Sequence, residues 1–166
     1  MNRRQLRQSI VMGTLTALTA VGCAGGMSGA KMGSGDVVAD RQRLMKLNGA
    51  SWADVQAKAK ANNIEAIAVN AETMALNAMH IPALFPEGSQ TAQSKAKPDV
   101  WQKWSEFEKA AKNFQTEAEK LRDAARAKNG DQVQAIVKAF GKNACGQCHT
   151  PFRQPPPKPA AQAPRS

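Results

Sequence analysis

Residues 98–125 read PDVWQKWSEFEKAAKNFQTEAEKLRDAA, and this stretch decides the fold. Apolar residues recur along it every three or four positions, as they do on one face of an α-helix. Pro98 stands where a helix does not use its N–H donor, and Asn129-Gly130 follows as a helix stop. We therefore predict one long amphipathic helix, whose inward stripe consists of Trp101, Trp104, Phe107, Ala111, Phe114, Ala118, Leu121 and Ala125.

Three other segments have the same periodicity, and they cover residues 37–61, 64–80 and 131–153. Pro82 ends the second of them, because proline lacks an amide donor and disfavours helical geometry in the residue before it. Asp131 is the expected N-cap of the last. Four amphipathic helices with short connections bury their apolar stripes best as an antiparallel bundle, so we predict an all-α four-helix fold.

The composition agrees with this fold class. Hydrophobic residues make up 42% of the 166 residues, but aromatic residues only 5%, and tyrosine is absent. This balance argues against a β-sandwich, whose strands use β-branched and aromatic residues. Three cysteines cannot form a complete disulfide framework. The formal net charge is +10, and it becomes +7 if Arg3, Arg4 and Arg7 are removed with a leader peptide. A positive charge favours acidic partners or anionic lipid surfaces.

The two ends of the chain differ from the middle. Residues 1–22 combine a basic start with a short apolar run, which predicts an export signal rather than a transmembrane helix. Residues 23–36 are expected to form a flexible tether, and residues 154–166 a proline-rich, disordered tail. Cys23 stands where a bacterial lipoprotein carries its acylated cysteine and could tether the protein to a membrane. The alternative is ordinary cleavage nearby, which discards Cys23.

Residues 145–149 read CGQCH, the C-x-x-C-H pattern of covalent c-type haem attachment. Cys145 and Cys148 share one face of a helix, so both can form thioethers with the porphyrin vinyl groups, and His149 can ligate the iron as the proximal ligand. The alternatives are a redox dithiol, a structural zinc site that needs four ligands, and a chance pattern in a helical interaction protein. The export signal favours haem, because c-type haem is attached outside the cytoplasm.

A C-x-x-C-H motif near the C-terminus, on the last helix of a predicted bundle, resembles cytochrome c′ and its low-spin relatives, the class II cytochromes c. The resemblance implies one covalent haem c in an antiparallel bundle that spans residues 37–153. It covers residues 40–153 and rests on residues 41–46, 84–88, 100–101 with Phe107, and 141–153, which include the motif.

The resemblance also places a residue of the first helix at the sixth iron position, four residues after a motif arginine. Here these are Met45 and Arg41. In low-spin members a methionine binds the iron, whereas in cytochromes c′ proper the residue is a wall behind which small gases bind. The stretch around Met45 is more similar to the low-spin relatives, although Arg41 is typical of cytochromes c′. Arg41 could also pair with a haem propionate, and Arg153 could reach the porphyrin edge; a solvated surface charge is the alternative for both.

We therefore predict a periplasmic haem protein that transfers single electrons and performs no enzymatic turnover. The alternative is a five-coordinate cytochrome c′ that binds nitric oxide or carbon monoxide. The positive net charge predicts an acidic redox partner. We expect no nucleic acid as a partner, because the lysines are spread along the helices and are not clustered. Members of this family often dimerise through their first two helices, and a homodimer could use the small residues Ala57, Ala61, Ala66 and Ala68.

Overall fold

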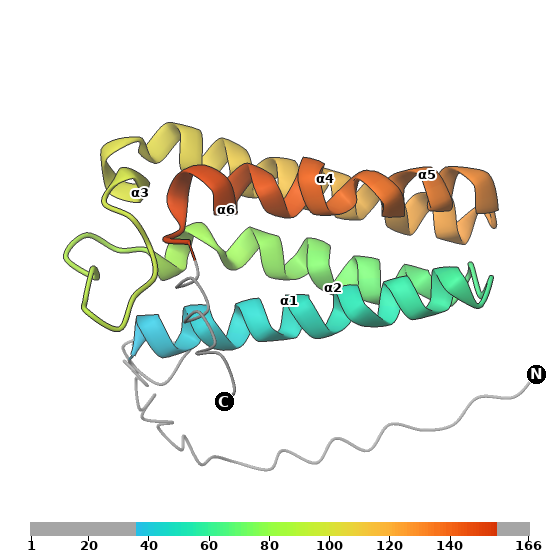
Figure 1. Ribbon diagram of the computed structural model, residues 1–166, viewed down its shortest axis with the longest axis horizontal. Helices are drawn as coiled ribbons and strands as arrows, with labels where there is room; N and C mark the ends of the chain where they lie inside the picture. Colours follow the sequence, from blue (N-terminus) through green and yellow to red (C-terminus); the bar gives the residue numbers. More distant parts are fainter. Residues whose placement is uncertain (1–35, 156–166) are drawn as a thin grey trace, which may run out of the picture. The chain divides into compact units, whose positions relative to one another are not determined.

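The computed structural model describes residues 36–155, which form the predicted antiparallel four-helix bundle (Figure 1). Three helices are long, and the fourth is a succession of three segments. The long helices are α1 (Val37–Lys60), α2 (Ile67–His80) and α4 (Trp104–Arg126). The fourth consists of α5 (Gly130–Phe140), the π-helical turn η2 (Gly141–Cys145) and α6 (Gly146–Phe152). The connection between α2 and α4 contains η1 (Pro82–Leu84) and α3 (Asp99–Gln102).

Several predictions fall on residues that the structure does not describe. The export signal, Cys23 and nearly all of the tether and the tail lie outside residues 36–155. Within that range, no helix combines the length and the apolar character that crossing a membrane requires. Gln154, the first residue of the predicted tail, still contacts the bundle, because its backbone N–H donates to the Lys95 carbonyl oxygen at 2.8 Å.

Local capping sets the helix boundaries. Asp36 is the N-cap of α1, and its side chain accepts from two backbone N–H groups at 3.0 and 3.1 Å. The N-cap prediction for the last helix was wrong, because Asn129 rather than Asp131 caps α5. The Asn129 side-chain oxygen accepts from the Gln132 N–H at 3.1 Å. Lys128 adopts a left-handed conformation, with φ of 54°, and leaves Asn129 at the start of the next helix.

The predicted third helix is divided in two. Lys103 has φ of −121° and ψ of 48°, which separate α3 from α4. Trp101 lies before the break, and its indole Nε1 donates to the carbonyl oxygens of Phe85 and Pro86, both at 3.1 Å. Trp101, which belongs to the predicted stripe, therefore binds the backbone of the connection between α2 and α4.

The last predicted helix contains the π-helical turn η2. One extra residue in a turn rotates everything that follows by roughly 100° relative to a continuous α-helix. The turn is tightly packed, since a Cβ atom at Gly146 would meet the Gly141 carbonyl oxygen at 3.3 Å. This turn thus sets the direction in which the C-x-x-C-H segment faces.

An aromatic cluster around Phe107 joins the connection, α4 and α6. The ring centroid of Phe107 lies 4.7 Å from that of Phe85, 5.4 Å from that of Phe152 and 5.6 Å from that of Trp104. Phe107 and Phe152 are buried, and the other two are half-buried. The cluster fixes α6, and the residues of the motif with it, against the rest of the bundle.

Candidate haem-binding site

A cavity of about 580 Å³ lies among α1, the connection and the η2–α6 segment. Figure 1 shows α1 and α6 on different sides of the bundle. The volume lies within the range of about 300–1,000 Å³ that is typical of ligand pockets. The wall is mainly apolar and includes Val38, Met45, Trp52, Met74, Ile81, Phe85, Val100, Phe107, Phe114, Ala144 and Phe152.

The two thiols of the motif lie on this wall. Cys145 ends η2 and Cys148 lies in α6, and both are free and half-buried. Burial raises the pKa of Cys145, and burial, with a smaller effect of Cys145, raises the pKa of Cys148 to about 11. Both groups are therefore protonated at neutral pH, unlike the reactive thiolate of a redox dithiol.

His149 follows on α6 and also lines the cavity. As a whole residue His149 is exposed, because it lies on the side of α6 at the rim of the core. Burial by the surrounding protein lowers the pKa of His149, and the positive charge of Arg153 lowers it further. The imidazole is therefore neutral at neutral pH, which is the form that binds iron.

The alternatives to haem do not fit these residues. Nowhere in residues 36–155 do three or more His, Cys, Asp or Glu side chains converge as they would around a metal ion. Cys145, Cys148 and His149 are thus not arranged as the ligand set of a structural zinc ion. In the same range the only strand-like pairing is a bridge between Ala96 and Arg153, so a redox dithiol has no sheet beside it. The residues instead spread two thiols and an imidazole along one wall, as attachment of a large macrocycle requires.

Met45 reaches the same cavity from α1. Its side chain is half-buried and packs against the core. The fold thus brings a thioether of the first helix and the imidazole of the last helix to one cavity. Arg153 lines the cavity as well, and its backbone pairs with that of Ala96.

Arg41 is buried, with 6% exposure, although it is charged. Its Nη1 donates to the Ser89 carbonyl oxygen and the Ser94 hydroxyl at 3.2 and 3.3 Å, its Nε donates to the Leu84 carbonyl oxygen, and its Nη2 to the Ser89 hydroxyl. The guanidinium carbon also lies 4.2 Å from the centroid of the Phe85 ring. Arg41 therefore holds the connection against α1, and its contact with a haem propionate stays a prediction.

Several residues of the site were not identified from the sequence pattern. Ser89 and Ser94 lie in a polar segment without periodicity, so nothing in the sequence marked them as partners of Arg41. Asn48 could have been recognised, because it is a polar residue at an inward position of the α1 stripe. It lines the cavity and is buried, with 8% exposure.

The residues that are present fit haem c. The cavity has the size and the apolar wall of a cofactor pocket, both thiols of the motif line it, and a neutral imidazole follows them. Cys145 and Cys148 would hold the porphyrin covalently, and His149 would ligate the iron.

Known proteins agree with this assignment. The family model described as Cytochrome C′ matches residues 36–153. Cytochrome c-556 from Agrobacterium fabrum is 34% identical over 146 residues, which cover 84% of this chain and 94% of that protein. Cytochrome c′ from Pararhodospirillum photometricum is 34% identical over 118 residues, which cover 69% of this chain and 93% of that protein.

A solved structure shows the same architecture. The crystal structure of cytochrome c′ from Rubrivivax gelatinosus matches with a TM-score of 0.63 and 27% sequence identity. The match covers 72% of this chain and 96% of that one. Sequence, cavity and fold therefore lead to one conclusion: this chain belongs to the cytochrome c′ family, whose members carry covalently attached haem c.

Proposed function

We propose that this protein transfers single electrons, with haem c held by Cys145 and Cys148 and its iron ligated by His149 and Met45. The observation that carries this proposal is the placement of Met45, because α1 supplies a thioether to the cavity to which α6 supplies an imidazole. Bound haem c supplies a reversible one-electron couple. No substrate bond needs to be made or broken, so the protein acts without enzymatic turnover.

The residues around the cavity suit this role. A thioether is a soft ligand, so Met45 would stabilise ferrous iron and raise the reduction potential relative to a second nitrogen ligand. The apolar wall would exclude water from the iron. Helix α1 and the aromatic cluster around Phe107 would hold the site rigid, so that little rearrangement accompanies a change of oxidation state.

The competing function is binding of nitric oxide or carbon monoxide, with Met45 as a wall rather than a ligand. The spin state of the iron separates a ligand from a wall, and a titration of the ferrous protein with carbon monoxide tests ligation by Met45. If Met45 ligates the iron, the gas must displace the thioether. The variant Met45→Ala should then bind carbon monoxide at least tenfold more tightly, which corresponds to about 1.4 kcal/mol of lost competition.

A matched control is Met79→Ala, since Met79 is 59% exposed on α2 and does not line this cavity. It should bind carbon monoxide as the wild type does. Equal affinity of the wild type and of Met45→Ala would contradict ligation of the iron by Met45 and with it the electron-transfer proposal.

The protein is proposed to act in the periplasm. The basic start and the apolar run of residues 1–22 support export, and attachment of c-type haem outside the cytoplasm agrees with it. Cys23 is the candidate for a lipid anchor at the membrane. The mass of the mature N-terminus tests both points, because an acylated Cys23 adds the mass of its lipid chains, whereas ordinary cleavage leaves an unmodified terminus.

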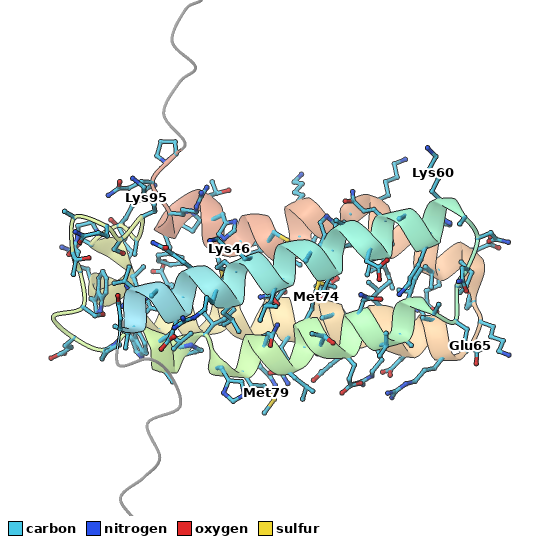
Figure 2. The ribbon with its side chains drawn as sticks, turned by 90° about the horizontal axis from the view of Figure 1, so that it is seen from below. Lys46, Lys60, Glu65, Met74, Met79 and Lys95 are labelled. Atoms are coloured by element: carbon cyan, nitrogen blue, oxygen red, sulfur yellow. The ribbon has the colours of Figure 1, made fainter. Side chains whose placement is uncertain are left out.

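The redox partner is proposed to be acidic and to dock at the cavity mouth. Lys46 of α1 and Lys95 of the connection line the cavity and are exposed, and Arg153 adds a third positive charge there. Figure 2 shows Lys46 and Lys95 in the half of the bundle that lies away from Lys60 and Glu65. A positive rim around the opening would attract an acidic protein to the point where the cofactor is most accessible.

A homodimer through α1 and α2 is a further proposal. Large apolar side chains are exposed on both helices, namely Leu47, Val69, Leu76 and Met79, with exposures of 52–66%. Ala57 and Ala61 are exposed as a helix contact would require, whereas Ala66 and Ala68 are half-buried. Sedimentation of the wild type and of Leu76→Glu tests this proposal, because the variant should be monomeric if this face pairs two copies.

A further inference from the structure

Asn48 carries an unsatisfied polar group at the cavity wall. Its Oδ1 accepts from the Asn77 Nδ2 of α2 at 2.8 Å, whereas its own Nδ2 is buried without a hydrogen-bond partner. A buried donor without a partner destabilises the fold, so its persistence in a native protein calls for an explanation. The other buried polar side chains that line the cavity, Arg41 and Ser94, bind each other.

The position of Asn48 indicates what the donor serves. It follows Met45 by three residues on α1, and side chains at this spacing are neighbours on one helix face. Both residues line the cavity. The bond from Asn77 holds the amide from its oxygen side, so the N–H group is left for a partner that the cavity provides.

We propose that Asn48 is a positioning residue for Met45, and that its Nδ2–H donates to the Met45 sulfur when the thioether ligates iron. This inference rests on the proposed electron-transfer function. A thioether sulfur has two lone pairs, so one can bind iron while the other accepts the hydrogen bond. The Met45 side chain has three rotatable bonds and turns readily to bring its sulfur within reach.

Such a bond has two consequences. It holds the sulfur at the iron and thereby opposes its displacement by an external ligand. It also withdraws electron density from the sulfur, which favours ferrous iron and raises the reduction potential. A donor that instead served an iron-bound gas would strengthen gas binding, so the two roles differ in the sign of their effect.

The test compares Asn48→Leu with the wild type in the holoprotein. Leucine keeps the branched shape and the number of non-hydrogen atoms of the side chain and removes the donor. We expect carbon monoxide to bind ferrous Asn48→Leu about fivefold more tightly, which is the factor that corresponds to one hydrogen bond of about 1 kcal/mol. The reduction potential should fall in the same variant. Asn77→Leu removes the hydrogen bond that orients the Asn48 amide but leaves the Asn48 donor in place. This variant should change the carbon monoxide affinity and the reduction potential in the same directions, by a smaller factor.

Asn70→Leu is the matched control, because Asn70 links α2 to α1 by accepting from Lys58 at 2.6 Å and does not line the cavity. It should leave both quantities unchanged. Unchanged or weaker carbon monoxide binding in Asn48→Leu overturns the inference, and Asn77→Leu decides the question if Asn48→Leu does not fold. If Met45→Ala gains affinity for carbon monoxide but Asn48→Leu does not, only the role of Asn48 is wrong. If neither variant gains affinity, the proposed function itself has failed.

Discussion

Trp52 of α1 stacks on Phe140 of α5, with ring centroids 4.7 Å apart and ring planes 19° from parallel. Phe140 is fully buried and meets Phe114 of α4 edge to face, with centroids 5.8 Å apart. Trp52 also lines the cavity. The stack therefore joins the helix that carries Met45 to the helix that leads into the haem-attachment motif. The rings of Trp52, Phe114 and Phe140 thus support both the core and the site.

Replacing Phe140 with alanine should destabilise the protein by about 3–5 kcal/mol, because it removes a large buried ring and leaves a cavity beside Trp52. Denaturant unfolding of the holoprotein measures this loss. Lys138→Ala is the control, since Lys138 is exposed on α5, away from the proposed dimer face, and its truncation should change stability by less than about 0.5 kcal/mol. A loss below about 1 kcal/mol for Phe140→Ala would mean that the stack does not support the fold.

Arg41→Ala should release the connection from α1. The buried guanidinium donates to groups of Leu84, Ser89 and Ser94, and hydrogen bonds to charged groups contribute about 1.5–3 kcal/mol each. We expect the free energy of unfolding to fall by at least the contribution of one such bond, about 1.5–3 kcal/mol. Trypsin should also cleave faster after Lys95. Arg41→Lys should restore only part of the stability, because an ammonium group lacks the planar fork of donors.

The control for Arg41 is Arg43→Ala, which lies two residues away on α1. Arg43 is exposed and pairs with Asp40, so its removal should cost about 1 kcal/mol or less. Equal effects of the two variants, or unchanged cleavage in Arg41→Ala, would contradict the role assigned to Arg41.

Charge reversal at the cavity mouth should slow electron exchange with anions. In the double variant Lys46→Glu with Lys95→Glu, the rate of oxidation by hexacyanoferrate(III) should fall severalfold at low ionic strength, because both side chains border the cavity. The difference should largely vanish at high salt. The control reverses Lys60 and Lys128, which are exposed and do not line the cavity. An equal reduction of the rate in both double variants would show that net charge, and not the rim, governs the encounter.

Asn129→Ala tests the observed start of α5. Loss of an N-cap side chain costs about 0.5–2 kcal/mol, so this variant should be destabilised by that amount. Asp131→Ala should lose less, because Asp131 lies in the first turn without capping the helix and contributes only about 0.3–1 kcal/mol through the helix dipole. Thermal unfolding of the two variants should therefore rank Asn129→Ala as the less stable.

The four helices could be predicted because each buries one periodic stripe. On α4, Phe107, Phe114 and Leu121 are buried as the spacing indicates. Trp101 and Trp104 follow the same spacing but lie on two sides of the break at Lys103. That break, like the π-helical turn before Cys145, depends on contacts between distant segments, which local periodicity does not report.

The site was predictable where chemistry requires a fixed spacing. The motif identified Cys145, Cys148 and His149, and the resemblance to class II cytochromes c added Met45. The partners of Arg41 could not be predicted, because Ser89 and Ser94 are brought to it from 48 and 53 residues away by a connection without regular structure. The unpaired Nδ2–H of Asn48 could not be predicted either. The orientation of this amide depends on the hydrogen bond from Asn77, which only the packing of α1 on α2 creates.

The electron paramagnetic resonance spectrum of the purified ferric holoprotein at neutral pH tests the central claim most directly. Ligation by His149 and Met45 predicts a low-spin signal that becomes high-spin in Met45→Ala. A high-spin signal in the wild type, unchanged in Met45→Ala, would contradict methionine ligation and with it the proposed role in electron transfer.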